Sequence, residues 1–294
     1  MKDESKEPEN LRFLMIMAGA VVCLGLVPLF EKLAVDSGSD LLTLVIAINL
    51  VTVVCLVVPA WRQRPEALFT QWRYLLLIGA IASGVVVLLN LWALKTTTAT
   101  HRSVFQAMYP AATAVFAYLL LGERLPLRGY AVIALMTIGI LVMSAQGLRW
   151  EFVFGDLLLM LTLPMMGLCD ALAKKSLGKL SAEWTAFNRF FYGSIMLIIV
   201  FGLSGTLPTW PVGDELLWIL LSGISIGLGI ILLYRGMALK GAALAAALVG
   251  LSPVLTLALE WLFLDGHFKL LELAGIVLVL VGGFLLSRRE FQEL

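Results

Sequence analysis

The sequence predicts an all-α integral membrane protein with ten transmembrane helices, built as two inverted repeats of five helices each. Composition is the first reason: 61% of the 294 residues are hydrophobic and only 14% are charged. A water-soluble domain of this size carries about 25% charged residues. The second reason is a series of apolar segments of bilayer-spanning length, and the third is a resemblance between the two halves of the chain.

The apolar segments follow one another with short connections. A helix needs roughly 20 apolar residues to cross the hydrocarbon core of a bilayer. The ten segments are 12–34, 41–60, 73–94, 103–121, 128–146, 154–176, 184–203, 215–234, 242–264 and 268–287. The connections are rich in turn residues, and none is long enough to form a domain outside the membrane. We therefore expect a tail at 1–11, a first repeat at 12–147 and a second repeat at 153–288.

Lys and Arg residues indicate the orientation of these segments. Positively charged residues are enriched in short cytoplasmic loops. With the N-terminus placed inside, 15 of the 21 Lys and Arg residues fall on the cytoplasmic side and five on the outer side. This bias predicts a multi-pass protein with both termini in the cytoplasm.

The second half of the chain repeats the first. When Pro110–Ser144 is aligned with Pro253–Ser287, ten of 35 positions are identical, including both prolines. Lys32 and Lys174 correspond in the same way at an offset of 142, and Leu94 and Leu239 at an offset of 145. Five spans per repeat turn the second copy upside down relative to the first, an arrangement found in alternating-access carriers.

The stretches 93–144 and 238–287 resemble the EamA-type repeat of the drug/metabolite transporter superfamily. The resemblance rests on an Ala-Leu entry, on the helix proline at Pro110, on the Gly-Glu pair at 122–123 and on the Gly-rich helix that follows. The second copy departs from the pattern because it has Asp265-Gly266 in place of Gly-Glu. The resemblance implies a ten-helix carrier of a bacterial inner membrane that exports amino acids or other small metabolites. The same superfamily includes exchangers of nucleotide sugars and phosphorylated sugars, and fold alone does not choose between these substrates.

Polar residues within the spans are candidates for substrate binding because a charge in the middle of a membrane helix costs roughly 2.5–3.5 kcal/mol on insertion scales. Asn90 and Arg235 occupy equivalent positions in the two repeats. Asn90 lies deep enough to line a substrate path or to form an interhelical hydrogen bond. Arg235 either binds an anionic group or reaches the membrane surface, as long basic side chains near span ends do.

The fourth and ninth spans each contain a proline preceded by polar side chains. Gln106 and Tyr109 precede Pro110, and Pro253 holds the equivalent place in the second repeat. Proline removes a backbone donor and bends a helix, so both positions are candidate hinges. Gln106 and Tyr109 are candidate substrate contacts beside the first of these bends.

Aromatic and charged side chains complete the candidate site. Trp92, Tyr109 and Tyr234 suit stacking on an amphipathic ligand, although tryptophans elsewhere fit an interfacial belt. Asp170 either carries a coupling proton or forms an intrahelical ion pair with Lys174, four residues on, and we favour the ion pair. Arg189 is interpreted as a packing or interface-anchoring residue.

These features favour a secondary transporter with a small-molecule substrate, embedded in a lipid bilayer and with a coupling proton as one option. A nucleotide-sugar or phosphate exchanger is the alternative within transporters, and it requires several basic side chains along the path. An intramembrane enzyme is a weaker alternative because the acidic residues Glu31, Asp170 and Glu260 are scattered and both histidines lie near span ends. We expect no cofactor, metal or nucleic acid, and the sequence leaves monomer and homodimer equally open.

Overall fold

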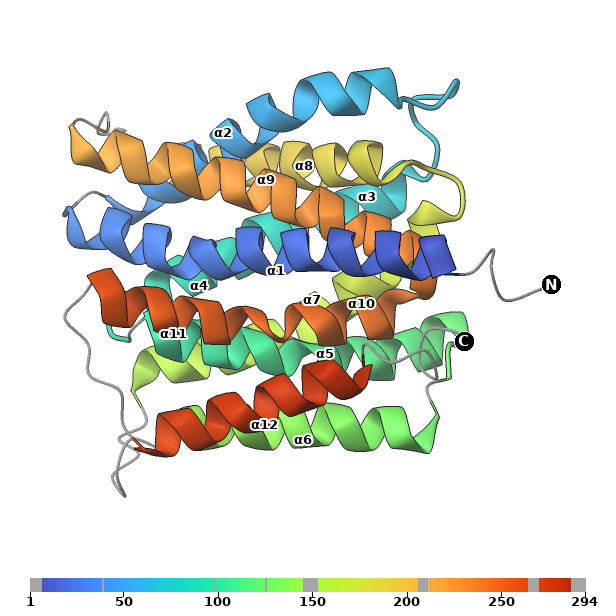
Figure 1. Cartoon of the computed structure of the whole chain (residues 1–294). Coiled ribbons are helices and arrows are strands. Elements are labelled where there is room, and N and C mark those ends of the chain that lie inside the picture. The colour runs from blue at the N-terminus through green and yellow to red at the C-terminus, as the bar shows by residue number, and fades with distance from the viewer. Residues whose placement is uncertain are drawn as a thin grey trace.

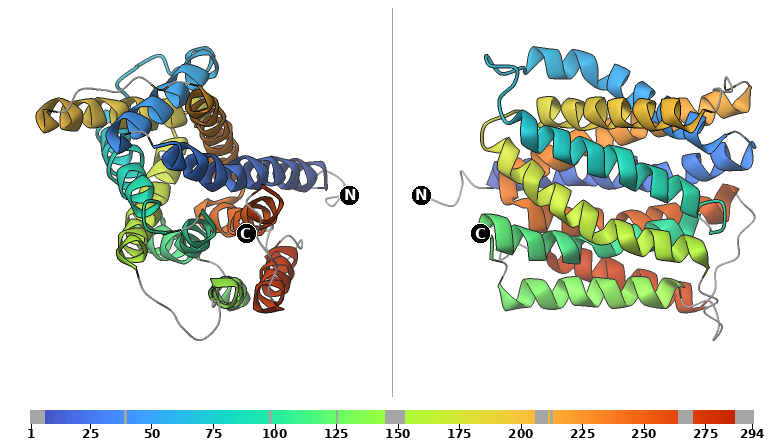
Figure 2. Two further views of the ribbon diagram at one scale, coloured as in Figure 1. Left: turned by 90° about the vertical axis from the view of Figure 1, so that its left-hand side faces the viewer. Right: turned by 180° about the vertical axis from the view of Figure 1, so that it is seen from behind.

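The computed structural model describes residues 7–38, 40–97, 99–124, 126–144, 153–205, 211, 213–263 and 270–286. Within these ranges all regular structure is helical, which confirms the all-α prediction for the described part of the chain. The elements are α1 (Glu7–Asp36), α2 (Leu41–Arg62), α3 (Trp72–Ile78), η1 (Gly79–Val85), α4 (Val86–Ala93), α5 (Ala99–Leu121), α6 (Leu127–Ser144), α7 (Phe154–Leu177), α8 (Ala182–Ser204), α9 (Asp214–Lys240), α10 (Ala242–Val249), α11 (Ser252–Phe263) and α12 (Leu270–Leu286). They form a bundle whose helices run roughly side by side (Figures 1 and 2).

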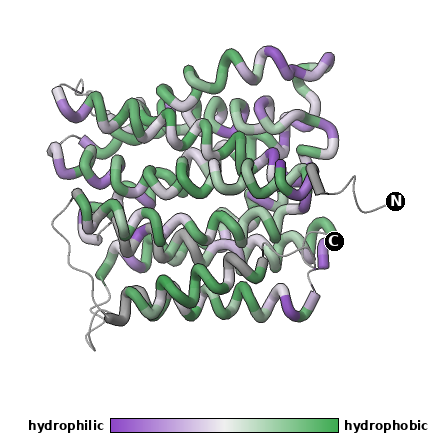
Figure 3. The backbone as a smooth tube through the Cα atoms, in the orientation of Figure 1, coloured by the Kyte–Doolittle hydropathy of each residue, from purple (hydrophilic) through white to green (hydrophobic). Residues whose placement is uncertain are grey.

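The bundle has the surface of a protein that lies in lipid. Among the described residues, seven helical segments are long and apolar enough to cross a membrane, and further shorter apolar helices lie within α5, α6 and α12. Hydrophobic residues fill the middle of the bundle, and hydrophilic residues gather at its two ends (Figure 3). Val54 and Leu119 are 71% and 66% exposed. A broad band of such side chains marks a surface in contact with an apolar medium.

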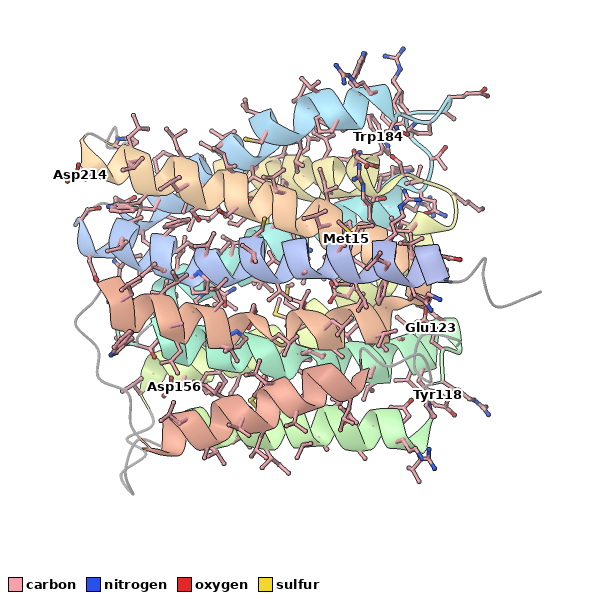
Figure 4. All side chains as sticks on the ribbon, viewed as in Figure 1. Met15, Tyr118, Glu123, Asp156, Trp184 and Asp214 are labelled. Atoms are coloured by element: carbon pink, nitrogen blue, oxygen red, sulfur yellow. The ribbon has the colours of Figure 1, made fainter. Side chains whose placement is uncertain are left out.

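The two ends of the bundle can be named by residues labelled in Figure 4. Trp184, at the start of α8, lies toward one end, and Asp156 and Asp214, at the starts of α7 and α9, lie toward the other. We call these the Trp184 end and the Asp156 end. The chain enters α1 at the Trp184 end (Figure 1), so α1 and α7 run in opposite directions.

The helices of the two halves pack against each other in a reciprocal pattern. α1 packs on α9, the third span of the second half, and α7 packs on α4, which ends the third span of the first half. Two further pairs join corresponding spans directly, because α2 packs on α8 and α6 packs on α12. The halves are therefore interleaved rather than laid side by side as separate units.

The structure departs from the predicted spans in three places. α1 begins at Glu7, so the last residues of the predicted 1–11 tail belong to the first helix. The third span contains the π-helix η1, a form often found at functional sites. The predicted span 242–264 is interrupted between α10 and α11, where Pro253 stands at the second position of α11. Pro110 lies inside α5, which continues through it.

Candidate functional site

A cavity of about 100 Å³ lies inside the bundle between the two halves. α1, η1, α4 and α5 line it from the first half, and α7 to α11 line it from the second. Most of its wall is aliphatic. Its polar and charged lining residues are Glu31, Asn90, Arg102, Tyr109, Thr162, Arg189 and Ser252. The cavity is therefore an apolar chamber with a few polar groups facing it, as ligand-binding sites usually are.

Arg189 is the central cation of this chamber. Its side chain projects from α8, which begins after the N-cap Ser181, and it is only 4% exposed. Nε donates to Ser83 Oγ at 3.1 Å, and Nη1 donates to Tyr234 Oη at 3.0 Å. The third contact is a weak one from Nη2 to Met166 Sδ at 3.9 Å. None of the ion pairs found among the described residues involves Arg189.

Small residues bring the π-helix close enough to hold this arginine. A Cβ at Gly79 would lie 2.7 Å from the carbonyl oxygen of Arg189, and a Cβ at Gly193 would lie 2.6 Å from Ser83 Cβ. Real Cβ atoms do not approach other atoms so closely, so both positions need glycine for η1 and α8 to touch. Membrane helices commonly use small residues in this way. The close approach places Ser83 within reach of the Arg189 guanidinium.

Asp170 of α7 is an acidic residue that interacts electrostatically with Arg189, and it is fully buried. Its Oδ2 accepts a hydrogen bond from Thr113 Oγ1 at 3.1 Å, whereas its Oδ1 has no hydrogen-bond partner among the described residues. Asp170, Arg189, Tyr109 and Tyr234 interact electrostatically with one another. Gly167 makes this contact possible because it packs directly on the Thr113 backbone.

The predicted ion pair between Asp170 and Lys174 is wrong. Lys174 Nζ instead donates to the carbonyl oxygen of Met237 at 2.6 Å, near the end of α9. This carbonyl also accepts from Gly241 N at 3.0 Å, and it lies in the last turn of α9, where the negative end of the helix dipole attracts cations. Asp170 faces α5 through Thr113, while Lys174 faces α9, so the two side chains take different partners despite their helical spacing.

A second polar feature of the cavity is an ion pair that the sequence interpretation did not include. Glu31 of α1 and Arg102 of α5 form a salt bridge, and both side chains are at least 96% buried. Arg102 is one of the five Lys and Arg residues that the sequence assigns to the outer side, and the structure places its side chain against the cavity. The pair joins the last two turns of α1 to the first turn of α5, near the Asp156 end.

The five other candidate residues from the sequence, besides Asp170 and Arg235, differ in their relation to the cavity. Asn90 and Tyr109 line the cavity, and Tyr234 is linked to it by its hydrogen bond with Arg189. Trp92 does not line it: the side chain is 48% exposed and makes an edge-to-face contact with Phe154. The side chain of Gln106 lies outside the described part of the structure.

Arg235 lies apart from the cavity, in a separate hollow of about 420 Å³. Its Nε donates to Glu183 Oε1 at 2.8 Å, and its side chain is 50% exposed. Arg12 and Ser181 line the same hollow, which lies at the start of α8 and thus at the Trp184 end. The equivalence of Asn90 and Arg235 in the repeat therefore does not bring their side chains into one site.

The fold and this cavity define a class of protein. A multi-pass helical bundle with a chamber between two interleaved halves, apolar but lined by a few polar groups, is the architecture of a membrane transporter. Residues 11–145 and 153–288 each match the model of the EamA-like transporter family. The chain belongs to this family, and the family resemblance seen in the sequence is confirmed.

Two further similarities agree with this assignment. Over 221 residues the chain is 26% identical to an "uncharacterized transporter" of Methanothermobacter thermautotrophicus (strain Delta H), a match that covers 74% of this chain. The matched region spans 64% of that relative's length. A crystal structure superimposes with a TM-score of 0.72 at 15% identity, covering 95% of this chain and 98% of the other, which shows a shared fold.

Proposed function

We propose that this membrane transporter is a secondary carrier that exports small metabolites such as amino acids by alternating access. The observation that carries the proposal is the position of the cavity, which is lined by helices of both halves. A site at the interface of two repeats becomes accessible from either side when one repeat rocks against the other. The proposal includes ten spans, related by a pseudo-two-fold axis in the plane of the membrane.

Equivalent contacts across the two halves support an inverted repeat. Thr113 of α5 donates to Asp170 of α7, and its counterpart Thr256 of α11 donates to the carbonyl oxygen of Gly25 in α1 at 2.7 Å. Gly25 and Gly167 also correspond, and each packs closely on the span that carries the other half's threonine. The same junction therefore occurs twice, with the roles of the halves exchanged, as a two-fold relation requires.

Hydrogen bonds join the two halves at both ends of the bundle. At the Asp156 end, Gly155 N donates to Thr96 Oγ1 at 3.1 Å, and Thr97 Oγ1 donates to Asp156 at 3.4 Å. At the other end, Ala242 N donates to Glu123 Oε2 at 3.1 Å. The cavity is also smaller than the roughly 300–1,000 Å³ of typical ligand pockets. These features fit a closed state, from which either end opens in turn.

The orientation is part of the proposal. The excess of Lys and Arg in the connections at one side favours an inner-membrane protein with its termini and the Trp184 end in the cytoplasm. Export then means loading through the Trp184 end and release at the Asp156 end. A transmembrane gradient would supply the energy, with Asp170 as a candidate carrier of a coupling proton.

Purified protein in liposomes tests this function. We expect saturable counterflow of a labelled amino acid into vesicles preloaded with the unlabelled compound, and no such uptake in protein-free vesicles. A thermal-shift screen of amino acids, purines and sugar phosphates would run in parallel. If no solute in this panel is transported or raises the melting temperature, the proposed function is wrong. Preferential transport of sugar phosphates would favour the exchanger alternative.

A further inference from the structure

Arg189 carries hydrogen-bonding capacity that the protein leaves partly unused. A guanidinium has five N–H donors in one plane. Two of them bind hydroxyl oxygens, of Ser83 and Tyr234, and a third points at the weak acceptor Met166 Sδ. The side chain is 4% exposed and lines the cavity, and it forms no ion pair within the described part of the chain. A buried charge of this kind is costly unless an anionic partner joins it.

Asn90 presents a hydrogen-bond acceptor to the same cavity, whereas Arg189 presents donors. Its side chain is 4% exposed, and its Oδ1 has no hydrogen-bond partner among the described residues. Burying an amide oxygen without a donor is unfavourable, so a donor from a ligand would be stabilised there. The carboxylate of Glu31 also lines the cavity, although Arg102 pairs with it.

The rest of the lining fits an apolar group. Leu24, Val86, Phe190, Ile226 and Leu233 form part of the wall around these polar atoms. The chamber thus offers one cation that forms no ion pair within the described residues, although Asp170 interacts with it electrostatically. It also offers one acceptor without a hydrogen-bond partner among those residues and an apolar surface. A small amino acid has the matching set: a carboxylate, an ammonium group and an apolar side chain.

We propose that Arg189 is the specificity-determining residue that binds the substrate carboxylate, and that Asn90 Oδ1 accepts a hydrogen bond from the substrate ammonium group. This inference rests on the proposed transport function and adds the identity of the recognised groups. The planar guanidinium binds a carboxylate through two parallel hydrogen bonds. Ser83 and Tyr234 hold its plane in place, and they act as positioning residues for this contact.

The arrangement favours a single carboxylate over a phosphate ester. A phosphorylated or nucleotide substrate requires several basic side chains. Two arginines, Arg102 and Arg189, are among the described residues that line the cavity, and Glu31 neutralises Arg102. Two other basic residues, Arg235 and Lys32, are not part of the lining. One available cation matches one negative charge.

The test measures discrimination between substrate analogues in the liposome assay. We expect the wild-type protein to transport alanine with kcat/KM about 10–100-fold higher than alaninamide, which lacks the carboxylate, because a charge-assisted hydrogen bond contributes that much to binding. Arg189→Gln should reduce this ratio toward one, and Arg189→Lys should keep part of it. Asn90→Leu should instead reduce the preference for alanine over propionate, which lacks the ammonium group.

Arg235→Gln is the matched control, because this arginine is exposed, paired with Glu183 and outside the cavity. It should keep both ratios. A purely structural role for Arg189 would lower transport of alanine and alaninamide equally and leave their ratio unchanged. If Arg189→Gln does not fold, the analogue comparison on the wild type and on Arg189→Lys still decides the matter.

The outcomes separate this inference from the proposed function. A wild-type protein that moves no solute overturns both. A wild-type protein that carries alaninamide as well as alanine, or moves only solutes without a carboxylate, overturns the role of Arg189 and leaves transport intact. An unchanged ratio of kcat/KM for alanine over alaninamide in Arg189→Gln also overturns the role of Arg189 and leaves transport intact.

Discussion

Lys32 and Lys174 occupy equivalent positions in the two halves and make the same type of contact. Lys32 Nζ donates to the carbonyl oxygen of Leu94 at 3.4 Å, and Lys174 Nζ donates to that of Met237 at 2.6 Å. Both carbonyls lie at the end of the third span of the lysine's own half. Each lysine therefore ties the first span to the third span and complements the negative end of a helix dipole.

This relationship predicts an effect of Lys174→Met on stability. The substitution keeps most of the apolar stem but removes the donor to α9, and a hydrogen bond to a charged group contributes about 1.5–3 kcal/mol. We expect a lower free energy of unfolding in an SDS titration. The control is Lys175→Met, because Lys175 is exposed and its Nζ lies 5.2 Å from the centre of the Tyr74 ring in a cation–π geometry. Equal stability of the two variants would contradict the role of Lys174.

The ion pair of Glu31 and Arg102 predicts that removing one partner greatly lowers the stability of the protein. Glu31→Gln leaves a buried guanidinium without its carboxylate, which costs about 3–5 kcal/mol. The pair of Lys32 and Asp36, at 2.9 Å and with side chains 22% and 51% exposed, provides the comparison, and Asp36→Asn should cost no more than about 0.5 kcal/mol. The reversed pair, Glu31→Arg with Arg102→Glu, should be more stable than either of its single variants. Glu31→Gln and Asp36→Asn of equal melting temperature would refute the structural importance of the buried pair.

Much of this architecture follows from the sequence, and the parts that do not have identifiable physical reasons. Helix positions are predictable because each span needs a long apolar segment, and Asn90 stands out as an amide within one. Arg189 was interpreted as a packing or anchoring residue because an arginine near a span end usually reaches the interface. Arg189 lies seven residues after the first residue of α8, which is about 10 Å along the helix axis. This depth is evidence against an anchoring role at the interface.

The salt bridge of Glu31 and Arg102 is a second feature that the sequence did not predict. The two residues are 71 positions apart, and neither apolar periodicity nor the repeat relates them. The error over Asp170 and Lys174 has the opposite origin, because helical spacing suggested a local pair while neighbouring helices offered each side chain a partner of its own. Contacts between spans thus decided the site, and a single sequence carries little information about them.

The contact between η1 and α8 predicts different consequences for two glycines of one helix. A Cβ at Gly193 would lie 2.6 Å from Ser83 Cβ, whereas a Cβ at Gly202 would meet nothing within 4 Å. Gly193→Ala should destabilise the protein by about 1–3 kcal/mol through overpacking. Gly202→Ala should be neutral or stabilising by up to about 1 kcal/mol, because alanine favours helix. Melting temperatures in detergent measure both, and a Gly193→Ala variant as stable as Gly202→Ala would disprove the close packing.

The contact between the halves at the Asp156 end predicts that a disulfide there blocks transport. Thr97 and Asp156 are in side-chain contact across the two halves at 3.4 Å. In a variant without the native cysteines Cys23, Cys55 and Cys169, Thr97→Cys with Asp156→Cys should lose counterflow on oxidation and recover it with reductant. Each single cysteine variant should be insensitive to oxidation. Undiminished transport by the cross-linked protein would show that this end does not need to open.

The inverted arrangement of the two halves is the central claim, and the sidedness of two corresponding positions tests it most directly. Lys95 follows the third span of the first half, and Lys240 ends the third span of the second half. Single cysteines at these positions would be labelled with a membrane-impermeant maleimide, in intact cells and in inverted membrane vesicles. The account predicts that the cysteine at 95 reacts from the outside and the cysteine at 240 only from the cytoplasmic side. Labelling of both from the same side would contradict inverted halves and, with them, alternating access through the cavity.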